Sequence, residues 1–267
     1  MSSNNKKRIT VITGATSGIG LAMAEYFSAR GDKVYAVARR EAPLPEGAEF
    51  IPADVTDEAR MREVVGLITE REGRIDVLIN NAGFGISGAV EFTKLEDAKR
   101  QLDVNFFGTV NTTKAVLPVM RAAGGGRVIC VSSVAAVTPI PFQAYYSASK
   151  AAINAYVMAL ANEVRPHGVR VSALMPGDVK TGFTAARAKS SEGAEVYPAL
   201  EKSVKTMEHD EQNGMPPSAL AKRAYFISTR RVPKPLYSCG FVYSLFCVLA
   251  GVLPKRLVNW ILSKLYA

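Results

Sequence analysis

The sequence contains few residues of the kinds that bind metals or form disulfides. Its 267 residues include only three cysteines and two histidines. Cys130, Cys239 and Cys247 are odd in number and lack metal-ligand spacing, and neither His167 nor His209 has companions of ligand type. This scarcity argues against a metal site and a disulfide framework, and it favours a reduced, cytoplasmic protein.

Signals for secretion and for nucleic-acid binding are also missing. Residues 1–8 are polar and basic, but no apolar stretch follows them as a signal peptide requires. The net charge is +9, yet no stripe of basic residues is interleaved with aromatics, so we expect no nucleic-acid partner. The positive charge has three possible meanings: a solvated basic surface, attraction to an anionic cofactor, or attraction to a membrane surface.

Short apolar segments alternate with longer segments of helical periodicity, and this order predicts the fold. The Val- and Ile-rich runs lie at residues 8–13, 33–38, 76–80, 127–132 and 169–174. The helical segments lie at residues 21–30, 58–71, 95–120 and 144–164. The alternation predicts a single α/β domain, a Rossmann-type doubly wound parallel sheet with helices on both faces. Ligands of such sheets bind at the carboxyl ends of the strands.

A glycine-rich turn at residues 13–20 follows the first expected strand and precedes a helix. Gly14, Gly18 and Gly20 lack side chains, which would let the backbone turn tightly and approach a pyrophosphate at the helix N-terminus. Alone, the same glycines could serve a purely structural turn. The strand–turn–helix context favours a dinucleotide site.

Tyr146 and Lys150 form a Tyr-x-x-x-Lys motif, and Ser133 lies thirteen positions upstream of the tyrosine. On a helix, positions i and i+4 share a face, so both side chains would point into one pocket. An ammonium near a phenol favours the phenolate, and we therefore expect Lys150 to lower the Tyr146 pKa from its usual value of about 10. The motif indicates nicotinamide-dependent chemistry on a carbonyl/alcohol pair.

The chain resembles the short-chain dehydrogenase/reductase family over roughly its first 230 residues. The motifs occur in the family's order and spacing. They are the Thr-Gly-x-x-x-Gly-x-Gly turn at 13–20, Asn80-Asn81-Ala82-Gly83, Asn105, Ser133, Tyr146, Lys150 and Pro176-Gly177-Asp178-Val179-Lys180-Thr181.

The resemblance implies a role for each of four catalytic residues. Tyr146 would be the general acid/base, and Ser133 would hydrogen-bond the reacting oxygen, so both would contact the substrate. Lys150 would lower the Tyr146 pKa and hold the nicotinamide ribose hydroxyls. Asn105 would anchor a water that links Lys150 to solvent, although an isolated asparagine more often forms a local backbone hydrogen bond.

The resemblance also implies a set of cofactor contacts. These are Gly14, Thr16, Ser17, Gly18, Ile19, Gly20, Arg39, Arg40, Asp54, Val55, Asn81, Ala82, Gly83, Tyr146, Lys150, Pro176, Gly177, Val179 and Thr181. Ala38 stands where an acid would bind the ribose of NAD, and Arg39 follows it. Because arginine pairs with a 2′-phosphate, we expect NADP(H), with Arg39 as the main contact and Arg40 as a second. The alternative is a pair of exposed surface arginines.

The substrate region is expected to be apolar. Residues 182–215 carry apolar side chains among many charges and predict a mobile helical lid, while residues 138–142 would form another wall. These walls favour a small lipophilic carbonyl or alcohol. We therefore divide the chain into a domain at 1–235, with its lid at 182–215, and an apolar extension at 236–267.

The extension begins with eighteen uncharged residues, 236–253, and continues into a segment whose apolar residues mostly share a helical face. Eighteen residues is near the lower limit for spanning a bilayer, and Ser238, Gly240, Ser244 and Gly251 weaken that interpretation. An initial part of the run could form a last sheet strand. We expect an amphipathic helix that lies peripherally on a membrane or covers the pocket, or one that docks on the domain or on a second subunit.

These observations predict an NADP(H)-dependent oxidoreductase of a hydroxyl/carbonyl pair, with a hydroxysteroid or similar lipid as the expected substrate. A reductase of 3-oxoacyl or other small carbonyl compounds is the enzymatic alternative. A non-catalytic NADP(H)-sensing or membrane-recruited binding protein is the alternative of another class. By resemblance we expect a homodimer or homotetramer that pairs through helices near residues 95–120 and 145–165.

Overall fold

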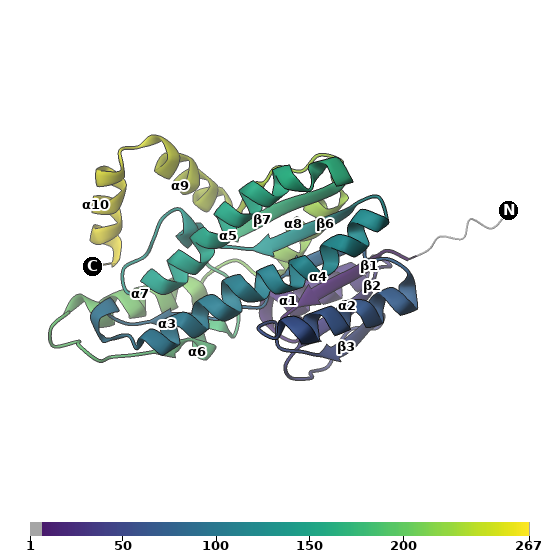
Figure 1. Cartoon of the computed structure of the whole chain (residues 1–267). Coiled ribbons are helices and arrows are strands. Elements are labelled where there is room, and N and C mark those ends of the chain that lie inside the picture. The colour runs from purple at the N-terminus through teal and green to yellow at the C-terminus, as the bar shows by residue number, and fades with distance from the viewer. Residues whose placement is uncertain (1–6, 267) are drawn as a thin grey trace.

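A seven-stranded parallel sheet forms the centre of the computed structural model, which describes residues 7–266 (Figure 1). The strand order is β3-β2-β1-β4-β6-β7-β9, so the chain winds outward in both directions from the β1–β4 pair. The strands are β1 (Ile9–Thr13), β2 (Lys33–Ala38), β3 (Ala48–Pro52), β4 (Val77–Asn80), β6 (Gly126–Val131), β7 (Val169–Pro176) and β9 (Leu236–Cys239). The Rossmann-type fold class is confirmed.

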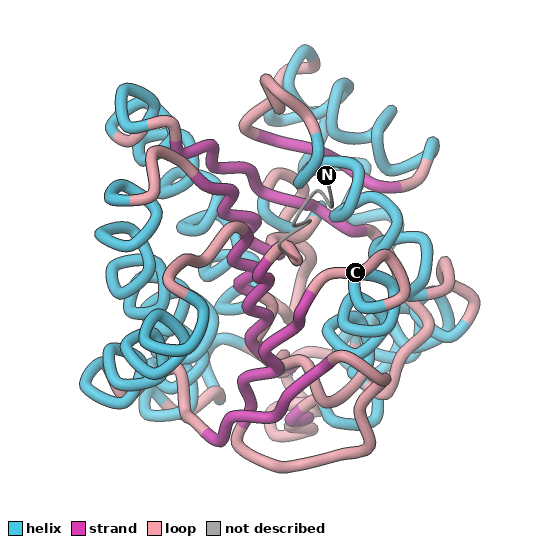
Figure 2. The backbone as a smooth tube through the Cα atoms, turned by 90° about the vertical axis from the view of Figure 1, so that its right-hand side faces the viewer, coloured by secondary structure: helices cyan, strands magenta, loops and turns pink. Residues whose placement is uncertain are grey.

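Helices cover both faces of the sheet, as the view along its layers shows (Figure 2). On one face, Phe27 and Leu220 belong to the core under α1 and α8; on the other, Ile68, Val116 and Ile153 belong to the core under α2, α4 and α5. The bounds are α1 (Gly18–Ser28), α2 (Glu58–Glu72), α4 (Gly108–Ala122), α5 (Ala144–Glu163) and α8 (Pro217–Thr229). The central strands β1 and β4 are buried along their whole length, as expected for strands that are covered on both faces.

The single helix expected over residues 95–120 is interrupted. The chain forms α3 (Leu95–Leu102), a π-helical turn η2 (Asp103–Phe107) and then α4. Asn105 lies in this turn, where its Oδ1 accepts the Phe84 N–H at 2.9 Å and its Nδ2 donates to the Phe84 carbonyl at 3.0 Å. The turn places this side chain against the loop after β4, and such π turns are frequent at functional sites.

The region expected to be a lid contains α6 (Phe183–Ala186), β8 (Ala188–Lys189) and α7 (Ala199–Gln212). β8 pairs with β5 (Ile86–Ser87) outside the main sheet. Short 3-10 turns, η1 (Val90–Phe92), η3 (Val134–Ala136) and η4 (Arg165–His167), complete the helical elements up to α8.

The uncharged run 236–253 contains two elements. Its first part is β9, which extends the sheet beside β7, and the second is α9 (Phe241–Val252). Gly240 separates them with a positive φ of 96°, a conformation that favours glycine. The chain then turns into α10 (Lys255–Tyr266), which folds back to contact α7 (Figure 1). Neither these tail helices, α9 and α10, nor any other helix within residues 7–266 is long and apolar enough to cross a membrane.

Candidate active site

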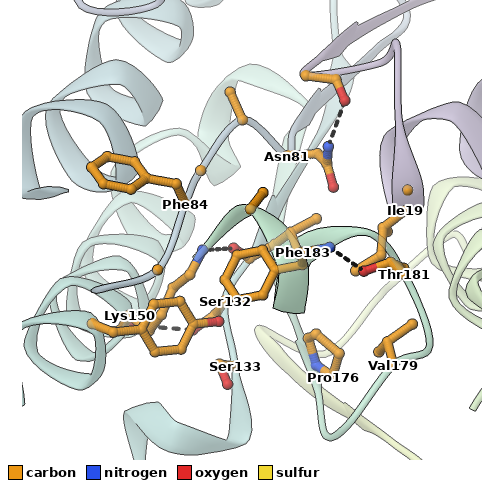
Figure 3. A pocket seen from close by; sticks show the side chains of 18 of the residues that line it. Ile19, Asn81, Phe84, Ser132, Ser133, Lys150, Pro176, Val179, Thr181 and Phe183 are labelled. Carbon is orange, nitrogen blue, oxygen red and sulfur yellow. Dashed lines mark hydrogen bonds between the residues drawn. The ribbon is translucent and has the colours of Figure 1, made fainter. Parts of the chain in front are cut away.

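A cavity of about 1090 Å³ is lined by residues at the carboxyl ends of β1, β2, β4, β6 and β7. This is the edge at which doubly wound sheets bind ligands. Figure 3 shows Ser133, Lys150 and Phe183 among the side chains that line it. Of the site residues predicted from the sequence, two do not reach the cavity wall, Gly20 and Asn105; all the others line it. The structure therefore brings together residues from positions 14 to 181 of the chain.

The glycine turn at the start of α1 is suited to a pyrophosphate. Gly14 has a φ of 64° and Gly18 a φ of 53°, so both occupy the left-handed region. Asn81 Nδ2 donates to the carbonyls of Thr13 and Gly14, each at 3.1 Å, and holds the turn against β4. Ser17, Gly18 and Ile19 at the start of α1 line the cavity. The first N–H groups of a helix have no partner within it, so this helix end is suited to bind a phosphate.

Gly20 is a structural glycine, contrary to the cofactor contact expected for it. A Cβ at Gly20 would lie 2.1 Å from the Gly14 carbonyl oxygen and 2.5 Å from Asn81 Nδ2. No side chain fits in this space. Gly20 therefore lets α1 pack closely behind the turn, and it supports the phosphate site without lining it.

The adenosine end of the cavity is positively charged. Arg39 and Arg40 follow β2 and both line the cavity. Arg39 Nη1 lies 3.9 Å from Asp54 Oδ2, and 69% of the Arg39 side chain is exposed, so its guanidinium has free donors. Asp54 and Val55 lie beside it on the wall. These donors fit an anionic group of a bound dinucleotide.

Tyr146, Ser133 and Lys150 meet at the middle of the cavity. Tyr146 and Lys150 come from the first turns of α5, and Lys150 Nζ lies 5.7 Å from the Tyr146 ring centroid. Ser133 follows β6, and its Oγ accepts the Ala135 N–H at 3.1 Å, which fixes the hydroxyl at the start of η3. A carbonyl oxygen in this space would meet two hydroxyl groups.

Burial raises the pKa of Tyr146 to about 12, and the Ser133 hydroxyl opposes the rise. The expected lowering by Lys150 is not found. Lys150 Nζ donates to the Val131 carbonyl at 2.8 Å, and burial lowers the pKa of this lysine to about 8. Removal from water disfavours the charged forms of both groups, and it is the largest cause of each shift. Tyr146 is therefore a protonated acid at neutral pH.

Asn105 lies behind Lys150 and does not line the cavity. Besides its two bonds to Phe84, its Nδ2 donates to Ser149 Oγ at 3.0 Å. A Cβ added at Gly83 would be 3.0 Å from Asn105 Oδ1 and 3.6 Å from Lys150 Nζ, so this glycine lets the two side chains approach. The water expected between Asn105 and Lys150 remains a prediction.

The far end of the cavity is built from the region expected to be a lid and from the tail helices, although none of their residues was predicted individually as a substrate contact. Phe183 of α6 lies 5.9 Å from the Tyr146 ring, centroid to centroid. Of the expected wall at 138–142, Thr138 and Ile140 line the cavity, and Phe142 beside them has a strained positive φ of 61°. The remaining lining residues at this end include Met207 and Glu211 of α7, Tyr243 and Phe246 of α9, and Leu262, Leu265 and Tyr266 of α10.

The tail helices therefore form part of the cavity wall. A Cβ at Gly177 would lie 2.3 Å from the Tyr243 ring, so the ring of α9 packs directly on the glycine after β7. Asp178, also on the wall, accepts a hydrogen bond from the Tyr243 hydroxyl at 2.7 Å. The uncharged run of the sequence was the available signal for these contacts, but it did not specify which residues would face the cavity.

Comparison with known proteins agrees with this geometry. A family model described as short chain dehydrogenase matches residues 8–192. The chain is 39% identical to the 3-ketodihydrosphingosine reductase of Bacteroides thetaiotaomicron over 264 residues, which cover 97% of this chain and 98% of that protein. A solved short-chain dehydrogenase from Streptomyces avermitilis superposes with a TM-score of 0.84 at 32% identity, with 98% of each chain covered.

Two other solved structures differ in their cofactor. ElxO with NADP bound is 25% identical, with a TM-score of 0.76 over 90% of this chain and 99% of that one. The 3-ketoacyl-(acyl-carrier-protein) reductase from Brucella melitensis, complexed with NADH, is 26% identical, with a TM-score of 0.74 over 87% and 95%. Similar folds thus accept either nicotinamide cofactor.

Proposed function

The chain belongs to the short-chain dehydrogenase family and is an oxidoreductase of the hydroxyl/carbonyl pair; we propose that it uses NADPH to reduce the ketone of a long-chain lipid. The observation that carries the proposal is the position of Tyr146 and Ser133 at the middle of a cavity whose far wall is apolar and includes the tail helices. Such a wall suits an alkyl chain next to the reacting carbonyl.

Three residues of the chain have separate roles in the proposed reaction. When bound, the nicotinamide supplies the hydride. The Tyr146 hydroxyl donates its proton to the carbonyl oxygen, and the Ser133 hydroxyl hydrogen-bonds the same oxygen where negative charge develops. The raised Tyr146 pKa keeps this proton in place at neutral pH, which suits reduction of a ketone. Lys150, buried beside the tyrosine, would hold the ribose hydroxyls of the cofactor.

The choice of NADPH rests on the two arginines after β2. Ala38 offers no carboxylate to the ribose, while Arg39 and Arg40 line the cavity at that end. An arginine gains a charge-assisted hydrogen bond with a 2′-phosphate, and NADH offers no such partner.

The proposed substrate class is a 3-keto sphingoid base or a close analogue. The 3-ketodihydrosphingosine reductase of Bacteroides thetaiotaomicron aligns along almost the whole chain, through the tail helices that build the apolar wall. A hydroxysteroid substrate remains a prediction from the sequence, and the named relative favours a linear lipid ketone over it.

A substrate comparison tests the proposal. Purified protein with NADPH would be given 3-ketodihydrosphingosine, a ketosteroid and a 3-oxoacyl thioester, with products identified by mass spectrometry. We expect kcat/KM for the sphingoid ketone to exceed the other two by at least about tenfold. Preference for the steroid or the thioester would contradict the substrate class, and no turnover of any ketone would contradict the activity.

The tail surface supports a second proposal, contact with an anionic lipid surface. Phe241, Val252 and Trp260 are 87%, 80% and 57% exposed, and further apolar side chains of α9 and α10 are exposed around them. Residues 236–267 contain no acidic residue and three basic ones, Lys255, Arg256 and Lys264. Apolar groups flanked by positive charge suit the interface of an anionic bilayer. Because the same helices line the cavity, a lipid substrate could enter from that surface.

A homodimer or homotetramer that pairs through α4 and α5 is the assembly we propose on the family resemblance.

A further inference from the structure

Asp178 is a carboxylate of the cavity wall that the reaction described above does not use. It lies directly after Pro176 and Gly177 at the end of β7. Its Oδ2 accepts a hydrogen bond from the Tyr243 hydroxyl at 2.7 Å. Within residues 7–266, no lysine, arginine or histidine forms an ion pair with it, and Oδ1 has no protein partner. Half of this partly buried carboxylate therefore remains free to bind a ligand.

Neighbouring carboxylates repel the negative charge of Asp178, so a bound cation would stabilise the ionised form of this side chain. Burial raises the pKa of Asp178, and the neighbouring Asp210 and Glu211 raise it further. The Tyr243 hydrogen bond opposes this rise, and Arg187 opposes it to a smaller extent. The Arg187 guanidinium is already paired with Glu211, and its side chain is 1% exposed. Asp178, Asp210 and Glu211 are thus close enough to repel one another, next to the apolar residues of the tail helices, in a chain whose net charge is +9. A cation bound beside Asp178 would relieve this repulsion.

Asp178 is also close to the reaction centre. Its charge is one of those that raise the pKa of Tyr146, so the carboxylate and the catalytic hydroxyl share one electrostatic environment. The Tyr243 bond and the packing of Tyr243 on Gly177 fix the carboxylate at the wall. Because Tyr146 and Asp178 line the same cavity, a substrate whose carbonyl oxygen meets Tyr146 would share that cavity with the carboxylate.

We propose that Asp178 binds the ammonium group of a ketone substrate that carries a protonated amine close to the reacting carbonyl. The inference rests on the proposed function and names the headgroup that the site selects. A 3-keto sphingoid base has such a group, with the amine on the carbon next to the ketone. The ammonium would donate to the carboxylate while the alkyl chain contacts the apolar residues of the tail helices, so the two ends of the substrate would be bound by different chemistry.

Three ketones of equal chain length test the proposal: the amino ketone, its N-acetyl derivative and the ketone without the amine. For each we would measure kcat/KM with NADPH. In the wild type we expect kcat/KM for the amino ketone to exceed that for both analogues by at least about tenfold. This ratio corresponds to the free energy of one charge-assisted hydrogen bond. Asp178→Asn should reduce that preference to about twofold or less, because the amide carries no charge.

Glu195→Gln is the matched control, because it removes an exposed lid carboxylate outside the cavity. It should keep the wild-type preference, and Asp178→Asn should keep the wild-type dissociation constant for NADPH. The assignment of Asp178 to the ammonium group is wrong if Asp178→Asn still prefers the amino ketone. It is also wrong if Asp178→Asn loses both this preference and NADPH binding. Equal wild-type rates on all three ketones would contradict the ammonium site alone, whereas no wild-type turnover of any of them would contradict the proposed function as well.

A wild-type measurement keeps the proposal testable if Asp178→Asn fails to fold. A long-chain alkylamine and the alcohol of the same length would be compared as inhibitors competing with the ketone. The amine should inhibit at least about tenfold more strongly. Equal inhibition by the two compounds would overturn the proposal.

Discussion

The Tyr243 hydroxyl donates a hydrogen bond of 2.7 Å to the Asp178 carboxylate, and this contact joins the tail helix α9 to the loop after β7. One residue belongs to a motif of the cofactor site, and the other to a segment that carries no catalytic motif. The bond places an apolar helix at the wall of the cavity, so the C-terminal segment contributes directly to the substrate site.

Tyr243→Phe should detach the hydroxyl from Asp178 while keeping the ring on Gly177. We expect the free energy of unfolding to fall by about 1–2 kcal/mol, because a partly buried carboxylate loses a donor. Denaturant unfolding measures this loss. Tyr197→Phe, which removes a hydroxyl bonded to the exposed Glu91, is the control and should cost less. Equal losses in the two variants would mean that the α9 contact contributes no more than a surface bond.

Lys150 should make stability depend on alkaline pH. Its folded pKa of about 8 lies below its usual value of 10.5, so between these values the unfolded chain binds more protons than the folded one. Stability contributed by this group therefore rises with pH through that window, by about 3 kcal/mol at most. The measurement is the free energy of unfolding at pH 7.5 and 10 for the wild type and for Lys150→Met.

Other groups titrate in the same range, so the difference between the two proteins is the informative quantity. The stability of the wild type relative to Lys150→Met should increase with pH. Lys202→Met, at an exposed position on α7, should leave the pH dependence of the wild type unchanged. If the stability difference between the wild type and Lys150→Met does not change with pH, the folded pKa of Lys150 is not lowered by burial.

Arg39→Ala should weaken NADPH binding and leave NADH binding nearly unchanged. The variant removes the guanidinium that would pair with the 2′-phosphate, and we expect the dissociation constant for NADPH to rise by about tenfold or more. Fluorescence titration with both cofactors measures the effect, with Arg121→Ala, an exposed arginine at the end of α4, as control. Equal weakening for both cofactors would contradict the assignment of Arg39 to the phosphate.

The tail surface predicts vesicle binding. The wild type should float with vesicles that contain an anionic phospholipid and float less with purely zwitterionic ones, because residues 236–267 carry positive charge only. Replacing Phe241, Val252 and Trp260 by serine should abolish flotation. Val232→Ser, a change at an apolar side chain that is 72% exposed outside the tail helices, should not. Flotation unchanged by the triple substitution would exclude this surface as the contact.

The sequence predicts the fold and the catalytic centre well because both depend on local patterns. The spacing of Tyr146 and Lys150 needs only a helix to bring the two side chains to one cavity, and α5 provides it. The central strands β1 and β4 consist mainly of Val, Ile and Leu, which the sequence reveals directly. The glycine turn also lies where a dinucleotide-binding turn is expected.

The remaining features depend on contacts between distant residues, which local patterns do not encode. The π turn at Asn105 is set by its bonds to the Phe84 backbone, and the flanking residues keep an ordinary helical periodicity. The role of Gly20 follows from a close approach to Gly14. The Tyr146 pKa is governed by burial, which appears only once the cavity has formed. The position of Asp178 opposite Tyr243 likewise needs the fold of the tail.

The rate of NADPH oxidation by 3-ketodihydrosphingosine, measured for the wild type, Tyr146→Phe and Tyr145→Phe, tests the central claim most directly. Tyr146 lines the cavity and its neighbour Tyr145 does not, so the two variants remove the same hydroxyl from adjacent positions. We predict that Tyr146→Phe lowers kcat by about 100-fold or more, the usual contribution of a general acid, while Tyr145→Phe remains near the wild-type rate. If Tyr146→Phe turns over at the wild-type rate, Tyr146 is not the general acid.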